Sequence, residues 1–411
     1  MTNTLAYRQS DTVLLRKAMP PERGHLLSDI TVGLDDLVGF ISKHYFDFYI
    51  KNGGSKIKFI TGRPGTGKTH FSGLLLDRAE QSAYITVSFS AKEIWLHDFR
   101  EVYLEILRQC DLENLIRRCA DTIIRELGYD PSAVREGQTL MDYLSEEGAA
   151  DAFTRSEIRA ALRQKFTRNP LLDNSFAACC SLLTGNILGH PVMEKANVDM
   201  INAYMHGDKT VKLSQLRAIG LSPSRVTKHN ARHLLRSLAE VVHIAGFSGI
   251  LVSIDDLEIL QQPKSEAAIR YTKTRRDDAY ENIRQLIDDI DSMRYIMFVM
   301  SFRRDLMDNE SYGLKSYQAL WFRMQSEVVS SRFNRFADII DLDRLSDEIF
   351  TPDALMELSE KVAGALGYDD QLKPVDEAAA AELIRRSEYG SLGLPYLVIK
   401  YMTEDGGADN V

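Results

Sequence analysis

The chain is poor in cysteine and has no long apolar segment, and each scarcity excludes a class of protein. Among 411 residues there are four cysteines, Cys110, Cys119, Cys179 and Cys180. Their number and spacing do not make the framework of a small disulfide-stapled secreted domain, so we interpret them as buried apolar side chains. No stretch approaches the ~18 apolar residues of a membrane-spanning helix, and the N-terminus lacks an apolar signal region. We expect a cytoplasmic protein with no membrane partner.

The charge balance sets a second limit. The chain carries 50 Lys and Arg against 59 Asp and Glu, a net charge of −9. This argues against a wholly basic nucleic-acid coat but leaves room for a local basic groove. Nor does the sequence contain a G-x-S-x-G elbow, a C-x-x-C pair or a dinucleotide fingerprint. Serine hydrolase, zinc-ribbon and dehydrogenase functions are therefore not supported.

A glycine-rich loop over residues 62–69 carries the strongest motif. It matches G-x-x-x-x-G-K-[ST], with a β-branched run before it and a helical pattern after it. Glycines let the backbone approach phosphates, and the N-terminus of the following helix favours anions. We predict that ATP is bound by the loop and the next residue, namely Gly62, Arg63, Pro64, Gly65, Thr66, Gly67, Lys68, Thr69 and His70. Lys68 would act on the β- and γ-phosphates, and Thr69 would ligate Mg²⁺.

An acidic strand end supplies the partner that such a loop needs. The apolar run 250–254 leads directly into Asp255 and Asp256. We predict that Asp255 holds Mg²⁺ and that Asp256 acts as the catalytic base towards the attacking water. Glu258 is the fallback base. The alternative is an acidic turn after a strand.

Two further catalytic candidates follow later strands. Ser301 ends the apolar run 295–301 and is a candidate sensor of the γ-phosphate; the alternative is a serine that caps the next helix. Arg332 precedes the last expected strand and is the candidate that would reach a neighbouring subunit's site, slightly ahead of Arg335. The alternative for both arginines is a solvated side chain.

The pattern of apolar residues predicts an α/β fold. Short apolar runs predict buried parallel strands at 56–61, 83–88, 249–254, 295–301 and 337–342. Residues 92–240 read as consecutive amphipathic helices, so we expect a P-loop core over 56–345 with a helical insertion at about 92–240. A lead-in over 1–55 and a helical C-terminal unit over 346–411 complete the division. The basic run 264–284 either follows a nucleic-acid backbone or is a solvated helix face.

Several segments together resemble one family. They are Leu15-Arg16-Lys17, Pro20-Pro21-Glu22-Arg23-Gly24, residues 31–35, the glycine-rich loop, residues 204–208, residues 245–249 with the acidic strand end, and residues 280–288. Over residues 14 to 345 the chain resembles the bacterial P-loop ATP-binding proteins of BREX-type phage-defence systems, in particular their smaller, BrxD-like members.

The resemblance implies an initiator-like AAA+ ATPase with a parallel-sheet core and a helical lid or winged-helix-like unit. It implies ATP and Mg²⁺ as cofactors, partner proteins of a defence system, a homo-oligomer, and DNA as a further ligand. Two positions depart from the family pattern. Asp256 stands where a glutamate is usual, and residues 393–396 lack an arginine near the lid's proline.

Three functions remain open at this point. The first is an ATPase, slow or stimulated by a partner, that couples ATP binding and hydrolysis to the assembly or activity of an anti-phage complex. The second is an ATP-bound regulatory switch with little turnover, which Asp256 favours. The third is a DNA-binding initiator or loader that uses the helices around residues 352–403.

Overall fold

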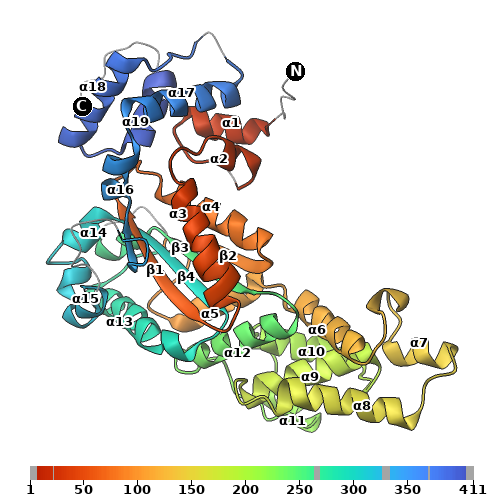
Figure 1. The fold of residues 1–411 in the computed structure, drawn as a ribbon. Coiled ribbons are helices and arrows are strands. Elements are labelled where there is room, and N and C mark those ends of the chain that lie inside the picture. Colours follow the sequence, from red (N-terminus) through yellow and green to blue (C-terminus); the bar gives the residue numbers. More distant parts are fainter. Residues whose placement is uncertain (1–6, 22, 263–268, 326–333, 369–370, 404–411) are drawn as a thin grey trace.

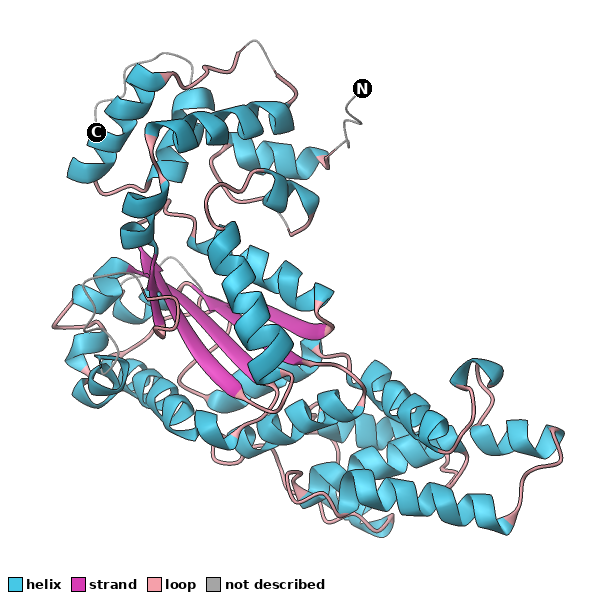
Figure 2. Ribbon diagram, in the orientation of Figure 1, coloured by secondary structure: helices cyan, strands magenta, loops and turns pink. Residues whose placement is uncertain are grey.

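A five-stranded, all-parallel sheet lies at the centre of the computed structural model, which describes residues 7–21, 23–262, 269–325, 334–368 and 371–403. The strand order is β2-β3-β4-β1-β5 (Figure 1, Figure 2). The strands are β1 (Ser55–Gly62), β2 (Tyr84–Ser90), β3 (Gly249–Asp255), β4 (Ile296–Arg303) and β5 (Ile339–Asp341). All five predicted strands and their parallel pairing are confirmed.

The central strands are buried on both faces, which explains their continuous apolar runs. In β3, Ile250, Leu251 and Val252 are fully buried. Because the strands are parallel, β1, β3 and β4 end at the same edge of the sheet, with Gly62 paired to Arg303. The glycine-rich loop and the acidic strand end therefore start from one edge.

Helices cover both faces of the sheet (Figure 1). One face packs against α3 (Asp35–Ile41), the π-helix η1 (Ser42–Ile50) and α4 (Lys68–Gln81). The other face packs against α5 (Phe99–Gln109), α12 (Ala231–Ile244) and α13 (Lys273–Asp289). Side chains alternate along β4 accordingly: Met297 and Val299 join the first layer, and Phe298 and Met300 join the second.

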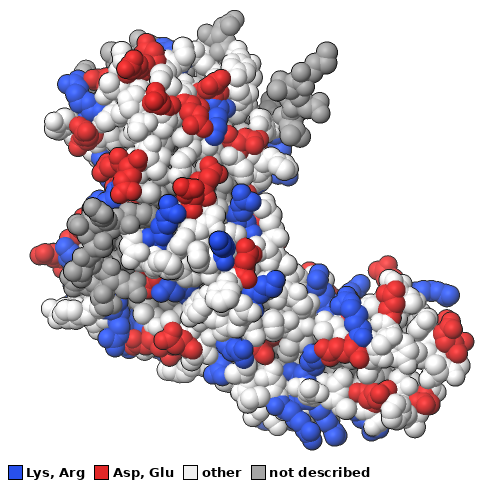
Figure 3. Space-filling view, viewed as in Figure 1, with Lys and Arg blue, Asp and Glu red and all other residues white. Residues whose placement is uncertain are grey.

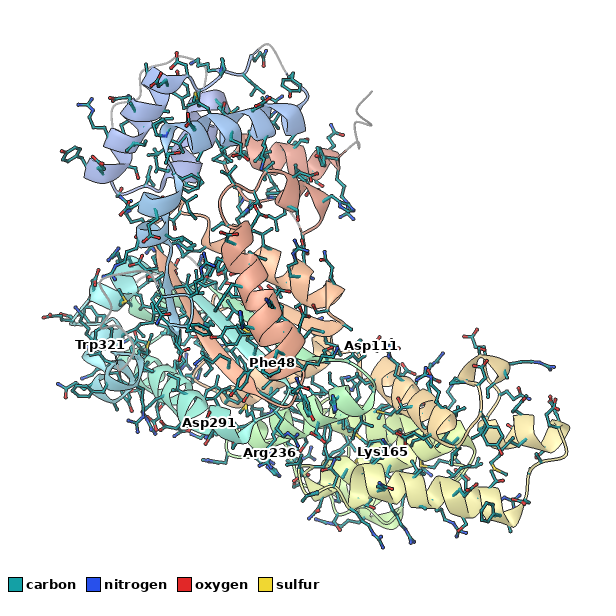
Figure 4. All side chains as sticks on the ribbon, in the orientation of Figure 1. Phe48, Asp111, Lys165, Arg236, Asp291 and Trp321 are labelled. Carbon is teal, nitrogen blue, oxygen red and sulfur yellow. The ribbon has the colours of Figure 1, made fainter. Side chains whose placement is uncertain are left out.

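A helical arm, defined as α5 to α12, connects β2 to β3 and extends away from the sheet (Figure 2). Figure 4 labels Asp111, the residue before α6, and Lys165 on η3. Between its first and last helices the arm contains α6 (Leu112–Glu126), η2 (Pro131–Ala133), α7 (Leu140–Glu146), α8 (Ala152–Leu162), the π-helix η3 (Arg163–Thr167), α9 (Asn174–Leu188), α10 (Lys195–Met205) and α11 (Leu213–Ala218). All four cysteines are buried and unpaired, as predicted.

The two ends of the chain pack together beyond the sheet (Figure 1). Leu15, in the first helix, and Ile30, directly after the second helix, belong to an apolar cluster. The same cluster contains Leu358 and Val398 of the C-terminal helices. The helices are α1 (Gln9–Arg16), α2 (His25–Asp29), α17 (Pro352–Leu366), α18 (Glu377–Tyr389) and α19 (Leu394–Thr403), with α16 (Leu342–Ile349) leading from β5 into them. The described residues after β5 contain no strand, so the wing of a winged-helix unit is not among them.

The remaining short helices connect these parts. They are η4 (Leu257–Gln261), η5 (Ile290–Ser292), α14 (Arg304–Asp308), η6 (Leu314–Ser316) and α15 (Gln318–Gln325). Across the described ranges, no helix has the length and apolar character that crossing a membrane requires.

Candidate nucleotide-binding site

The glycine-rich loop connects β1 to α4. Gly65 and Gly67 have φ values of +79° and +91°, a left-handed conformation that glycine adopts without steric cost. Gly67 is the residue before α4, so the loop leads directly into the helix N-terminus. The Lys68 ammonium donates to the carbonyl oxygens of Gly62 at 3.0 Å and Arg63 at 2.9 Å. The lysine thus lies folded over its own loop.

Carboxylates surround Lys68. Burial lowers the pKa of the ammonium, and Glu258, Asp343 and Asp255, in that order, oppose the shift. An ammonium placed above a loop of backbone N–H groups suits the negative oxygens of a polyphosphate.

Asp255 lies at the carboxyl end of β3, next to Thr69. The Thr69 side chain is hydrogen-bonded to this carboxyl group, and burial raises the Asp255 pKa to about 6, with Asp256 adding to the shift. The Asp255 Oδ1 atom is buried without a hydrogen-bond partner in the described chain. Buried polar atoms normally have partners, and Mg²⁺ takes oxygen ligands. The two residues predicted to hold the metal are therefore adjacent, and they fit a divalent cation.

Asp256 points elsewhere. Its backbone is left-handed, with φ of +62°. Its carboxylate accepts hydrogen bonds from the Ser90 hydroxyl at 2.7 Å and the Lys92 ammonium at 2.6 Å, both just after β2. Asp256 is not among the charges that shift the pKa of Lys68.

Glu258, on η4, is oriented differently. It is 8% exposed, and its carboxylate accepts a hydrogen bond from the Arg303 backbone N–H at 3.2 Å. The Arg303 guanidinium lies 3.5 Å from the same carboxylate. Among the neighbouring charges, Glu258 has the largest effect on the pKa of Lys68. The fallback base, Glu258, therefore lies within electrostatic reach of the loop lysine while paired with Arg303.

Ser301 lies inside β4, opposite Ile60, and is 2% exposed. The alternative, a serine that caps the next helix, is wrong, because α14 begins at Arg304 and Arg303 stands before it. Arg303, which the sequence did not single out, is paired with Gly62 at the edge of the sheet, and its guanidinium lies against Glu258 and Asp305. The predicted strand ended at Ser301, but β4 continues for two more residues, and this extra length places Arg303 at the edge of the sheet.

Only one of the two candidate arginines before β5 is within the described residues. Arg332 lies outside the described residues. The Arg335 guanidinium is 3.8 Å from the carboxylate of Asp36, at the start of α3, and lies over the ring of Phe40.

Arg63 connects the loop to two other elements. Its backbone N–H and its Nε donate to the Asp343 carboxylate at 3.0 and 3.1 Å. Its Nη1 donates to the Ser387 carbonyl at the end of α18. Arg304 lies 3.3 Å from Asp343 as well, so the carboxylate is shared by two guanidinium groups. Neither Asp343 nor Ser387 belongs to a motif that can be recognised in the sequence.

The N-terminus of α19 lies directly on the loop. The backbone N–H of Gly393 donates to Pro64 O at 2.8 Å, and that of Tyr396 donates to Gly65 O at 3.2 Å. A Cβ atom at Gly65 would lie 2.4 Å from the Tyr396 Cβ. The loop therefore has no room for a side chain at this position.

A cavity of about 260 Å³ opens beside residues 65–70. Its walls come from both ends of the chain and are mainly apolar; they include Leu15, Met19, Val32, Phe350, Pro395 and Ile399. His70 also lines it, and its Nε2 lies 2.8 Å from the Thr31 hydroxyl oxygen. Burial lowers the pKa of His70 to about 4. A mainly apolar cavity beside a phosphate-binding loop suits the flat ring of a nucleotide base.

The chain was compared with known proteins in three ways. A search of curated proteins and a search of solved structures found no match. A family model described as BREX system ATP-binding protein BrxC/D matches residues 7–399. This match includes the glycine-rich loop, the acidic strand end and most of α19. The chain therefore belongs to the BrxC/D family of BREX system ATP-binding proteins.

Proposed function

We propose that this protein is a Mg²⁺-dependent P-loop ATPase of the AAA+ type, which couples ATP binding and hydrolysis to the assembly or activity of a phage-defence complex. Family membership supports ATP binding and the defence context. The observation that carries the metal-dependent part is the buried, unpartnered oxygen of Asp255 beside Thr69 and Lys68.

Each part of the site has a role in this proposal. The backbone N–H groups of residues 62–69 and the Lys68 ammonium bind the phosphates, and the apolar cavity takes the base. Thr69 and Asp255 hold Mg²⁺, which when bound neutralises charge on the β- and γ-phosphates. Ser301, on the α4 side of β4, is the candidate sensor.

We propose Glu258 as the residue that orients the attacking water. Its carboxylate is buried against Arg303 and acts on Lys68, whereas the Asp256 carboxylate is held by Ser90 and Lys92 after β2. Asp256 remains the second candidate for this step.

The C-terminal helices and the partner interactions complete the proposal. Helices α17–α19, which contact the loop through Gly393 and Tyr396, would form a lid over the nucleotide. The divisions at residues 1–55, 56–345 and 346–411 belong to the same proposal. So does a homo-oligomer in which Arg332 reaches a neighbouring site, working with partner proteins of the defence system.

A second function is an ATP-bound switch with little turnover. The ion pair between Asp256 and Lys92 supports it, because that pair keeps one acidic residue away from the loop. Single-turnover hydrolysis by the parent protein distinguishes the two functions, since a switch would retain unhydrolysed ATP.

The metal site is tested by the effect of Mg²⁺ on ATP affinity. We expect Mg²⁺ to tighten binding of a fluorescent ATP analogue to the parent protein. Asp255→Asn should lose most of this gain but keep the affinity measured in EDTA, because the loop is intact. Asp256→Asn is the matched control and should keep the gain. An undiminished gain in Asp255→Asn would refute the metal site.

A further inference from the structure

The charge of the chain is distributed very unevenly. Residues 155–236 contain 13 Lys and Arg and 5 Asp and Glu, a net charge of +8. Since the whole chain has a net charge of −9, the rest of it carries −17. On the face shown in Figure 3, Lys and Arg side chains gather at the lower edge of the arm near α11, and Asp and Glu side chains lie among them towards α8. The whole arm, residues 99–244, contains 19 Lys and Arg and 18 Asp and Glu, so its basic pole is confined to residues 155–236.

Three arginines form a stripe on this pole. Arg155, Arg159 and Arg163 follow one another at four-residue intervals along α8 and the start of η3, and all three are exposed. At 100° per residue they fall within an arc of about 80°. Glu157 lies about 160° from the middle of that arc, on the opposite side of the helix. The helical face between Arg155 and Arg163 therefore carries positive charge, with Asp151 at its N-terminal end.

None of the three arginines forms an ion pair with any residue that the structure describes. Other cations of the arm are engaged: Lys165 pairs with Glu126 at 2.5 Å, and Arg232 pairs with Asp289 at 2.9 Å. Like charges four residues apart destabilise a helix. Asp151, the N-cap residue of α8, is the nearby carboxylate: hydrogen bonds from Thr154 lower its pKa most, and the charge of Arg155 adds to the shift. A stripe that keeps two repulsions and forms no ion pair is suited to an external anion.

The surroundings of the stripe add positive charge. Arg159 and Arg155 lie close enough to His190 to lower its pKa, although burial is the larger cause. Further exposed cations of the arm without an ion pair among the described residues are Arg168, Lys195, Lys209, Lys212, Arg217 and Lys228.

We propose that the arginine stripe of α8 and η3 binds the phosphate backbone of duplex DNA. A duplex presents about one negative charge per 1.7 Å of its axis, which a row of unpaired guanidinium groups matches. Single-strand binders add aromatic side chains for base stacking. The exposed aromatic nearest the stripe in sequence, Phe153, lies about 120° from its centre, so the stripe offers charge without stacking. The predicted binding is independent of sequence and steeply dependent on salt.

The proposal goes beyond ATP binding and does not rest on it. The stripe lies on the arm, whereas the glycine-rich loop lies at the edge of the sheet (Figure 1). Loss of ATP binding in a loop variant should therefore leave DNA binding intact.

Fluorescence anisotropy with a labelled mixed-sequence 30-bp duplex tests the stripe. The full-length parent is compared with the triple variant Arg155→Gln, Arg159→Gln, Arg163→Gln at several salt concentrations. We expect the triple variant to bind roughly tenfold or more weakly at 0.1 M salt, with the slope of log K against log salt reduced by about 2–3. The control removes the same charge from α6 and the segment after η2 through Arg117→Gln, Arg125→Gln and Arg135→Gln, all exposed, and should stay close to the parent.

Circular dichroism and ATP affinity of both variants check that the fold is kept. Three results would overturn the proposal. They are no duplex binding by the parent at 50 mM salt, equal affinity and slope in parent and triple variant, and an equal loss in the control variant. Loss of binding to an acidic protein partner with unchanged binding to DNA would also overturn it.

Discussion

The Lys92 ammonium lies 2.6 Å from a carboxylate oxygen of Asp256, which holds this residue away from the glycine-rich loop. Glu258 instead lies buried beside Arg303 and acts on Lys68. We predict that Glu258→Gln lowers the rate of ATP hydrolysis by roughly 10²- to 10⁴-fold, because general-base positioning contributes on that scale. Asp256→Asn should change it only a few-fold. Steady-state phosphate release measures both.

The ATP affinity of both variants must also be measured and must match that of the parent, so that a slower rate is not caused by weaker binding. Lys92→Met should also change the rate little, because it releases Asp256 only. A large loss in Asp256→Asn with normal turnover in Glu258→Gln would assign the base to Asp256. No turnover in the parent would favour the switch.

Gly65 is predicted to be irreplaceable for a steric reason. Gly65→Ala would bring a Cβ within 2.4 Å of the Tyr396 Cβ and would place alanine at φ of +79°. The left-handed conformation alone costs roughly 1–2 kcal/mol for alanine. We expect ATP affinity to fall tenfold or more, because either the loop or α19 must move. Gly128→Ala, at φ of +89° with nothing within 4 Å, carries the strain without the clash. Equal effects on ATP affinity would exclude the contact as the cause.

His70 predicts a pH dependence of stability. Its folded-state pKa is about 4, against an ordinary value of 6.5, because burial disfavours the charged ring. The contribution of neutral His70 to the free energy of unfolding is therefore complete above pH 6.5. It is lost as the pH falls towards 4, by at most about 1.4 kcal/mol per pH unit. His70→Gln keeps a donor for Thr31 but does not titrate. Urea unfolding should show a flatter profile between pH 4 and 6.5 for this variant than for His229→Gln, an exposed control.

Arg63 predicts a mechanical link between the loop and the C-terminal helices. Arg63→Ala removes the side-chain bonds to the Asp343 carboxylate and to the Ser387 carbonyl, and it keeps the backbone N–H bond to Asp343. We expect residues beyond α16 to become more sensitive to limited proteolysis, while the sheet keeps its protection. Arg78→Ala, on the same helix as Lys68 but distant from α18 in sequence, is the control. Unchanged cleavage in Arg63→Ala would show that α19 alone holds the contact.

The sheet was predictable because its strands are continuous apolar runs between breakers. Residues 249–254 and 295–301 are buried on both faces, so composition alone marks them. The proximity of Thr69 and Asp255 was also predictable, because parallel strands end at one edge. These inferences need only local pattern and strand direction.

Other features depend on contacts between distant segments. The bond from Arg63 to Asp343 spans 280 residues, and the cluster joining Leu15 to Leu358 joins both ends of the chain. No local pattern encodes such pairs. The orientation of Asp256 was equally hidden, because it depends on one left-handed backbone angle and on Ser90 and Lys92.

Calorimetric titration of Mg·ATP into Lys68→Ala is the most direct test of the central claim. The ammonium of Lys68 is the cation placed over the loop, so its removal should weaken ATP binding at least tenfold and abolish turnover. Lys51→Ala, an exposed lysine just before β1, should bind and hydrolyse ATP like the parent. Parent-like binding and hydrolysis by Lys68→Ala would contradict the account.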